Sequence, residues 1–396
     1  MSSTEEETKI LSEKVLNAVG ISASVLLADL GFNSGIFDAL AASTDPQTAA
    51  ELAKRSGLVE RYVADWLSNQ VAAGFVSLVR PIEEPPRFFL SDAQKRVFVQ
   101  LENPSCQVAF LHMLTGLSAN IVNRLPTDFK EGKGFAFGDN HPLLFKVKEL
   151  MIRKNQHQFD AHFIAPVVEA FPNRFKERLM RTQKGAPLVV VDVACGSGFL
   201  LKEFHKRYPS NLYIGLDNHL PFLENAGLEE GNPENKNPLF ALADAHAIPS
   251  LCNISGAAAV WNTVCPNFPN LSPLPSKVDV FILTDALHDL SDPLAALISM
   301  REQLVPDGVI VVREPGNKDP RLDAIAGSTD PMPLLWSAAG VCVCGPATMG
   351  GRADGVACTS HSLGTVAPDS TYFAIGERAG FSDTVKVVER LFRFEN

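Results

Sequence analysis

The chain has 396 residues, of which 46% are hydrophobic and 20% charged, a composition typical of a globular protein and not of a disordered one. Its length exceeds what one ordinary core holds and predicts two domains. The formal net charge of −10 argues against nucleic acid or an anionic membrane as a partner and is compatible with a cationic small molecule. Because no apolar run reaches about eighteen residues and the start lacks a signal peptide's basic and apolar regions, we expect a cytoplasmic protein without a membrane span.

The seven cysteines are odd in number and follow no regular framework, which predicts reduced thiols and not disulfides. Cys342 and Cys344 lie two residues apart, but no histidine-rich segment accompanies them. We therefore expect no metal site in this protein.

The first hundred residues have the pattern of a winged helix. Apolar positions at helical spacing over 10–41, interrupted at Gly20 and Gly31, predict two or three helices. Capping, turn and alternation signals then predict helices over 46–57 and 59–73 and strands over 75–79 and 87–91. We assign residues 1–100 to a winged-helix and dimerisation domain.

A winged helix can bind DNA or serve as a dimerisation and packing module. The helix in the position of a recognition helix carries Glu60, Arg61 and Asp65 and is not basic. Since phosphate contacts need Lys and Arg, the sequence favours dimerisation and packing.

Residues 101–180 have a helical pattern with a loop over 132–140, and we assign them to a helical linker and substrate lid. Phe135, Phe137 and Phe145 cluster there. Aromatic residues in a helical layer form core more often than they form a substrate pocket, and both interpretations stay open.

Beyond residue 180 the pattern alternates between apolar strands and helices. Strands are predicted over 188–193, 212–216, 239–242, 278–283 and 309–312. Near-continuous apolar strands with intervening helices indicate an α/β domain with a doubly wound, mostly parallel sheet over residues 181–396. Ligands of such sheets bind at the carboxyl ends of the strands.

The strongest motif follows the first of these strands. Asp192, Ala194, Cys195, Gly196 and Gly198 form a small-residue turn that leads into a helix, where backbone can approach a ligand closely. A dinucleotide site requires Gly or Ala three positions after the last glycine, but Leu201 stands there, which disfavours an NAD-dependent oxidoreductase. The carboxylate of Asp192 suits a ligand with an ammonium and a sulfonium group.

Further polar residues end the next strands. Asp217 closes the second strand, where a carboxylate can accept both ribose hydroxyls, and Asn218 follows it. Asp244 and Ala245 close the third strand, where a carboxylate can accept an adenine amino group. Together with Asp285 after the fourth strand, these residues complete the candidate cofactor site.

These motifs resemble the nucleotide site of class I S-adenosylmethionine (SAM)-dependent methyltransferases. The segments Leu287-His-Asp-Leu-Ser-Asp-Pro293 and Leu304-Val-Pro-Asp-Gly308 are similar to those of O-methyltransferases with an N-terminal winged helix. The segments Ala49–Ala53 and Arg61–Leu67 also resemble the helical domain of a bacterial group of these enzymes. The resemblance covers most of residues 45–315 and implies SAM as cofactor, a homodimer, and an N-terminal domain that contributes to the substrate pocket.

The resemblance also implies catalytic roles. In plant-type members a histidine of the His-Asp motif is the general base, which corresponds to His288 followed by Asp289, and a glutamate after the fifth strand orients it, which corresponds to Glu314. The residues themselves agree, since His288 lies at the end of the fourth strand and histidine titrates near neutral pH. The alternative is that His288 and Asp289 only cap and pack the next helix.

Two segments depart from the family pattern. The segment 251–277 is longer than a strand connection needs and has no assigned role. After residue 380 one strand, 385–389, is clear, and the last strand is expected to be short or missing.

Residues 332–362, with Trp336, Met349 and His361, are predicted to line the acceptor pocket.

The predicted function is transfer of the SAM methyl group to a small-molecule hydroxyl, thiol or amine by direct displacement. The alternative is a SAM-binding regulatory or interaction protein without turnover. No motif identifies the acceptor, because pocket residues in a helical lid come from scattered positions.

Overall fold

The computed structural model describes residues 3–80, 85–181, 186–227, 237–254, 276–315, 326, 330–350, 363–364 and 367–396. The chain divides into two compact units. The first comprises Met1–Asn123 and Asn140–Phe159, and the second comprises Arg124–Asp139 and Asp160–Asn396. The segment 101–180 is shared between the two units.

The first unit begins with one long helix, α1 (Ser3–Asn33), followed by α2 (Ile36–Ala41). The expected interruptions at Gly20 and Gly31 are wrong, because α1 runs through both glycines. At Gly31 the glycine serves packing: a Cβ there would lie 2.3 Å from Cζ2 of Trp66. Trp66 Nε1 also donates a hydrogen bond to the Leu27 carbonyl at 2.7 Å, so the nitrogen-bearing edge of its indole is held against α1.

The predicted helix-turn-helix and wing follow. The helix α3 (Ala49–Ser56) starts with a capping box between Thr48 and Glu51 and ends at Gly57, whose φ of 71° is the left-handed conformation that favours glycine. The wing strands β1 (Ser77–Leu78) and β2 (Phe88–Phe89) are shorter than predicted. The remaining helices of this unit are α4 (Glu60–Ala72), α5 (Asp92–Phe98), α6 (Val108–Asn123) and α8 (Pro142–Lys154).

A buried polar cluster joins α1 to α6. His112 Nδ1 lies 2.5 Å from Asp29 Oδ1, and the Thr115 hydroxyl donates to Asp29 Oδ2 at 2.6 Å. Because Asp29 and His112 are both almost completely buried, these bonds satisfy groups that would otherwise destabilise the packing of the two helices.

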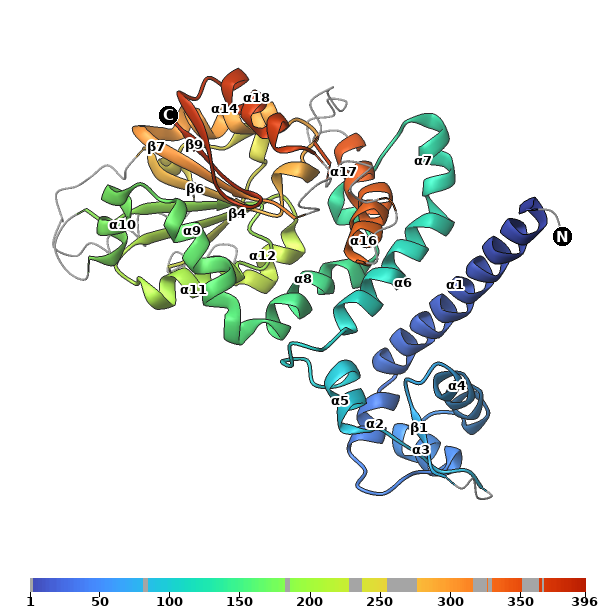
Figure 1. The fold of residues 1–396 in the computed structure, drawn as a ribbon. Helices are drawn as coiled ribbons and strands as arrows, with labels where there is room; N and C mark the ends of the chain where they lie inside the picture. The colour runs from blue at the N-terminus through green and yellow to red at the C-terminus, as the bar shows by residue number, and fades with distance from the viewer. Residues whose placement is uncertain are drawn as a thin grey trace. The chain divides into compact units, whose positions relative to one another are not determined.

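The second unit is built on a seven-stranded sheet with the order β5-β4-β3-β6-β7-β9-β8 (Figure 1). The first five strands in this order are parallel to their neighbours, and β9 pairs antiparallel with both β7 and β8. The strands are β3 (Val189–Val193), β4 (Leu212–Asp217), β5 (Leu239–Leu242), β6 (Val278–Thr284), β7 (Leu304–Arg313), β8 (Asp383–Val388) and β9 (Leu391–Glu395). This is the predicted doubly wound, mostly parallel α/β domain.

The expectation of a short or missing last strand is wrong. β9 has five residues and lies between β7 and β8 in the sheet, and its apolar residues Leu391, Phe392 and Phe394 are buried. The apolar run of this strand is interrupted in the sequence by charged residues, Arg390, Arg393 and Glu395, so its hydrophobic pattern does not identify it as a strand.

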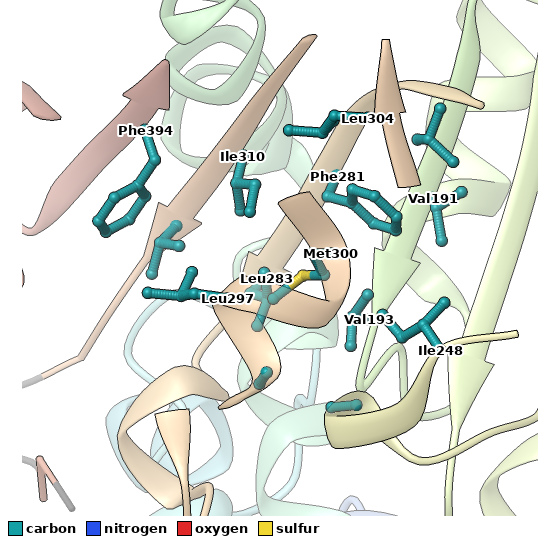
Figure 2. Packing of buried hydrophobic residues seen from close by; sticks show 14 of the residues in the cluster. Val191, Val193, Ile248, Phe281, Leu283, Leu297, Met300, Leu304, Ile310 and Phe394 are labelled. Atoms are coloured by element: carbon teal, nitrogen blue, oxygen red, sulfur yellow. The ribbon is translucent and has the colours of Figure 1, made fainter. Parts of the chain in front are cut away.

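Helices cover both faces of the sheet (Figure 1). On one face, Leu297 and Met300 of α14 pack on Val191 and Val193 of β3 and on neighbouring strands (Figure 2). All five residues of β3 are buried, as expected for a strand covered on both sides. The helices of this unit are α7 (Leu125–Glu131), α9 (Ala165–Ala170), α10 (Asn173–Met180), α11 (Phe199–Arg207), α12 (Leu220–Ala226), α14 (Pro293–Gln303), α16 (Met332–Ala339), α17 (Gly345–Met349) and α18 (Asp369–Arg378).

A buried ion pair fixes α10 to the amino ends of β3 and β6. The Arg178 guanidinium donates to both carboxylate oxygens of Asp279, at 2.6 and 2.9 Å, and to the Pro187 carbonyl at 2.9 Å. Asp279 Oδ2 also accepts the Val189 N–H at 2.9 Å. A bidentate pair with these additional bonds holds the two central strands in register.

Two stretches of helix, Thr4–Asn33 and Met332–Met349, are long and apolar enough to cross a membrane by length and composition alone. A mostly buried core helix and an N-terminal signal sequence meet the same criterion, so this test alone does not identify a membrane span. Most of segment 251–277 and His361 lie outside the described residues.

Candidate active site

The predicted site residues lie at the carboxyl ends of five adjacent parallel strands. Asp192 is on β3, Asp217 ends β4, and Asp244 lies two residues beyond β5. Asp285 and Glu314 directly follow β6 and β7. β3 lies between β4 and β6, so β4 and β5 are added on one side of β3 and β6 and β7 on the other. The carboxyl end of the sheet at this reversal is the topological switch point, where doubly wound sheets bind ligands.

The glycine turn after β3 has a strained backbone. Ala194 has a φ of 57°, which side chains rarely adopt, and Gly196 and Gly198 have φ values of 55° and 68°. A Cβ on Gly198 would lie 2.2 Å from the Phe240 ring, so only glycine fits there. Strain of this kind concentrates at ligand sites. Leu201, in the helix that follows this turn, is fully buried. A dinucleotide site would need Gly or Ala at this position, so the packing of the larger Leu201 side chain argues against such a site.

Asp217 fixes the shape of this turn. Its Oδ2 accepts the Gly196 N–H at 2.9 Å, and its Oδ1 accepts the His219 N–H at 2.8 Å. The carboxylate is largely buried at the end of β4, and Asn218 follows it. Asp217 therefore joins two loops of the candidate cofactor site.

Asp244 is held by a histidine that sequence reasoning did not identify. His246 Nε2 accepts the Asp292 N–H at 3.3 Å, so the ring proton is on Nδ1, which lies 2.6 Å from Asp244 Oδ1. The backbone N–H of His246 also donates to Oδ1 at 2.9 Å, and Ala245 beside them is buried. This contact could have been predicted from the sequence, because the histidine follows the strand-end aspartate by only two residues.

Asp285 adopts the left-handed conformation, with a φ of 54°. Its N–H donates to the Arg313 carbonyl at 2.7 Å, and its Oδ1 lies 3.5 Å from Arg313 Nη1. The Arg313 guanidinium also lies over the Phe163 ring, 4.0 Å from its centroid. These contacts fix the turn after β6.

The two residues expected to cooperate in catalysis are in contact. His288, in the 3₁₀ turn η6 (Leu287–Asp289), forms a short hydrogen bond through Nδ1 to Glu314 Oε2. The other oxygen of Glu314, Oε1, accepts the Leu287 N–H at 2.9 Å. His288 and Glu314 are 2% and 3% exposed. The carboxylate is thus held by the Leu287 N–H and orients the imidazole through one bond at Nδ1, with Nε2 on the other side of the ring.

Two other side chains face Nε2 of His288. Asp289 Oδ1 lies 3.3 Å away, and Cys344 Sγ lies 3.6 Å away. Burial disfavours the imidazolium, but the charges of Asp289 and Glu314, with a contribution from Cys344, hold the pKa of His288 well above its usual value. Burial in turn raises the pKa of the Cys344 thiol to about 12.

Cys344 ends the π-helix η7 (Gly340–Cys344), which lies between α16 and α17. Cys344 belongs to the segment 332–362 that the sequence analysis expects to line the acceptor pocket, but its contact with His288, 56 residues away along the chain, was not predicted. Single turns of π-helix are frequent at functional sites. Of the predicted pocket residues, Trp336 lies on α16 and Met349 ends α17.

Comparison with known proteins agrees with this geometry. Residues 22–83 match the profile of the Rv2258c-like winged HTH domain, and residues 185–345 match that of a methyltransferase domain. A search of curated protein sequences finds no match.

Solved structures share the fold along nearly the whole chain. Human N-acetylserotonin methyltransferase in complex with SAM is 17% identical, with 100% of this chain and 99% of that chain covered and a TM-score of 0.59. A mitomycin 7-O-methyltransferase is 15% identical, with 98% of each chain covered and a TM-score of 0.56. A protein described as a pericyclic reaction enzyme is 14% identical, with 96% and 88% covered and a TM-score of 0.52.

The chain therefore consists of a winged helix-turn-helix domain and a class I methyltransferase domain, as the sequence predicted. SAM, the methyl donor of such domains, is confirmed as the class of cofactor. Structural likeness at this identity defines the fold alone, and the reaction has to be argued from the site.

Proposed function

We propose that this protein transfers the methyl group of SAM to a small-molecule hydroxyl, thiol or amine. The observation that supports it best is the row of strand-end carboxylates beside a buried His288–Glu314 pair, all on one edge of the sheet. We further propose that residues 101–180 form a lid over the acceptor, that 332–362 line its pocket, and that the protein acts in the cytoplasm without nucleic acid or membrane.

The residues present fit the cofactor. Asp192, the glycine turn and Asp285 supply acidic and backbone groups for its amino acid portion, and Asp217, Asn218, Asp244 and Ala245 would hold the nucleoside. When bound, SAM would supply an electrophilic methyl carbon: the acceptor's lone pair would form the new bond to it in line as the S–CH₃ bond breaks, and the neutral thioether S-adenosylhomocysteine would leave. The chain contributes mainly by holding donor and acceptor in place, an effect of about 7–11 kcal/mol in favourable systems.

The second contribution is proton removal. His288 Nε2 accepts the proton of a hydroxyl acceptor as the new bond forms, while Glu314 on Nδ1 stabilises the resulting imidazolium. Nε2 must be unprotonated and accessible for this step. A thiol acceptor needs this help less, because part of it is already thiolate near neutral pH.

The test is an assay of S-adenosylhomocysteine formation from SAM with a panel of phenols, thiols and amines. The parent protein should turn over at least one class, and His288→Ala should lower kcat by about 10²–10⁴-fold with SAM affinity unchanged. His205→Ala, which removes a half-buried histidine of α11 outside the proposed lid and site, is the matched control. SAM binding without turnover of any acceptor would instead favour a SAM-binding regulatory protein.

We also propose that the protein is a homodimer through α1. Leu11, Val15 and Val19 are spaced four residues apart along this helix and are 62%, 55% and 61% exposed. A stripe of this kind at helical spacing is typical of a surface that a second chain covers. Light scattering at micromolar concentration should give a dimer mass for the parent and for Lys9→Glu and a monomer mass for Val15→Glu; a monomeric parent would contradict the proposal.

A further inference from the structure

The three atoms that meet at the catalytic histidine form a set of metal ligands. His288 Nε2, a carboxylate oxygen of Asp289 and Cys344 Sγ all lie within 4.8 Å of one another. Nitrogen, oxygen and thiolate sulfur together are the ligand set of zinc, and three protein ligands with a fourth position open are typical of its catalytic sites. The sequence predicted no metal, because no histidine-rich segment accompanies Cys342 and Cys344; the distance between Cys344 and His288 along the chain hides that they lie together.

The distances fit a tetrahedral ion. With Zn–S of about 2.3 Å and Zn–N of about 2.05 Å, tetrahedral geometry separates sulfur and nitrogen by about 3.6 Å. With Zn–O of about 2.1 Å, it separates nitrogen and oxygen by about 3.4 Å. Cys344 Sγ and Asp289 Oδ1 lie 3.6 and 3.3 Å from His288 Nε2. Both separations match two edges of the tetrahedron without any movement of the side chains.

Two other observations point to a ligand at this position. Asp289 Oδ1 is buried and, apart from its 3.3 Å ionic contact with His288 Nε2, accepts no hydrogen bond from any residue in the described part of the chain, so it has room for a further partner such as a cation. Glu314 binds the opposite ring nitrogen of His288, and a carboxylate in that position orients the histidine ligands of zinc and raises their basicity.

Two acidic side chains, Asp289 and Glu314, contact the His288 ring, so a divalent cation at Nε2 would lie among groups that attract it. A bound Zn²⁺ ion itself drives deprotonation of a coordinating thiol, so the Cys344 thiol can serve as a ligand.

We propose that His288, Asp289 and Cys344 bind one Zn²⁺ ion, with Glu314 supporting His288 and the fourth position open to water or to the acceptor. The ion takes the lone pair of Nε2 that proton removal requires. Zn²⁺ and the acceptor's proton therefore compete for His288, and Zn²⁺ inhibits methyl transfer to a hydroxyl. This inhibition rests on the proposed function, whereas ion binding does not.

Binding is tested with the full-length protein, freed of metal by a chelator and titrated with Co²⁺ as a spectroscopic probe and with Zn²⁺ in a calorimeter. The parent should bind one ion, with a thiolate-to-cobalt charge-transfer band in the near ultraviolet. Cys344→Ser should lose the band and bind at least about 100-fold more weakly, and Asp289→Asn should keep the band but bind more weakly. Cys342→Ser, which removes the other buried cysteine of η7, should bind as the parent does.

Circular dichroism of each variant shows whether it is folded. A parent that binds no ion, or a folded Cys344→Ser protein that binds as the parent does, would overturn the site. The activity arm measures S-adenosylhomocysteine formation against Zn²⁺ concentration, and the midpoint of inhibition should equal the dissociation constant in the parent and disappear in Cys344→Ser. Activation by Zn²⁺ would uphold the site and overturn both the inhibition and the role of His288 as base. If no acceptor is ever methylated, the proposed function fails, and the binding results still decide the site.

Discussion

Replacing Glu314 by Gln tests whether the hydrogen bond between Glu314 and His288 Nδ1 orients the imidazole for proton removal. Glu314 accepts two hydrogen bonds, from Leu287 N–H and from His288 Nδ1. A glutamine keeps one acceptor oxygen but presents an NH₂ group in place of the other. If that group faces Nδ1, the ring proton moves to Nε2, which is the wrong tautomer for a base. A hydrogen bond to a charged group contributes about 1.5–3 kcal/mol, which corresponds to about a 10- to 150-fold loss in kcat.

The pH dependence gives a second readout with a definite sign. The pKa of His288 is raised by Asp289 and Glu314 against the effect of burial, so the unprotonated base becomes populated only well above the usual pKa of histidine. The rate of the parent should therefore rise with pH through that raised pKa. Glu314→Gln removes one of the two carboxylates, so its rate should rise at a lower pH than that of the parent, although its maximum is lower.

The assay is S-adenosylhomocysteine formation at saturating SAM and acceptor, measured against pH in the presence of EDTA. Glu377→Gln, at an exposed position on α18, is the matched control and should behave as the parent does. A structural role for Glu314 predicts loss of stability and of SAM affinity together, with no shift along the pH axis. A folded Glu314→Gln protein with the parent's kcat and pH profile would refute the orienting role.

Three other predictions follow from single contacts. Asp217→Ala should weaken SAM binding by about 1–3 kcal/mol, because the ribose loses a charged acceptor and the Gly196 turn loses its anchor; unchanged affinity by calorimetry would remove Asp217 from the site. Arg178→Met should lower the free energy of unfolding in urea by about 3–5 kcal/mol, because it leaves the Asp279 charge buried without its partner, and a loss below about 1 kcal/mol would contradict this. The raised pKa of His288 in the folded protein should make the free energy of unfolding of the parent exceed that of His288→Gln most below a pH of about 6.5, and this difference should shrink as pH rises through the folded pKa. The difference is measured by urea unfolding at several pH values, and a difference that grows with pH would contradict the prediction.

Much of the sheet, and the meeting of the candidate cofactor residues at one of its edges, can be predicted from the sequence because their signals are local. Each parallel strand is a short apolar run, and each candidate residue stands at its carboxyl end, so the position along the chain gives the position in space. The contact between His288 and Glu314 also follows from this logic, since β6 and β7 are neighbours. The predicted strands, with the positions of their ends, are therefore sufficient to predict that these side chains lie together.

Contacts that depend on tertiary packing could not be predicted in this way. Gly31 looks like a helix break in sequence, but its missing side chain makes room for Trp66. Cys344 approaches His288 only because a π-helix, which has no sequence signature of its own, carries it there. Both errors have the same origin, because a residue that serves a distant neighbour carries no periodic signal.

The misjudged last strand bears directly on the site. Arg390, in the turn between β8 and β9, has a φ of 57°, and its carbonyl accepts the Glu314 N–H at 2.8 Å. Its guanidinium donates to the Pro315 carbonyl at 3.0 Å and to the Ala367 carbonyl at 2.8 Å. The backbone of Glu314 is therefore fixed by the end of the chain while its side chain orients His288. The pairing of β9 with β7 thus sets the geometry of the His288–Glu314 pair, so a chain without β9 would retain the motif residues and lose the support that holds Glu314 against the imidazole.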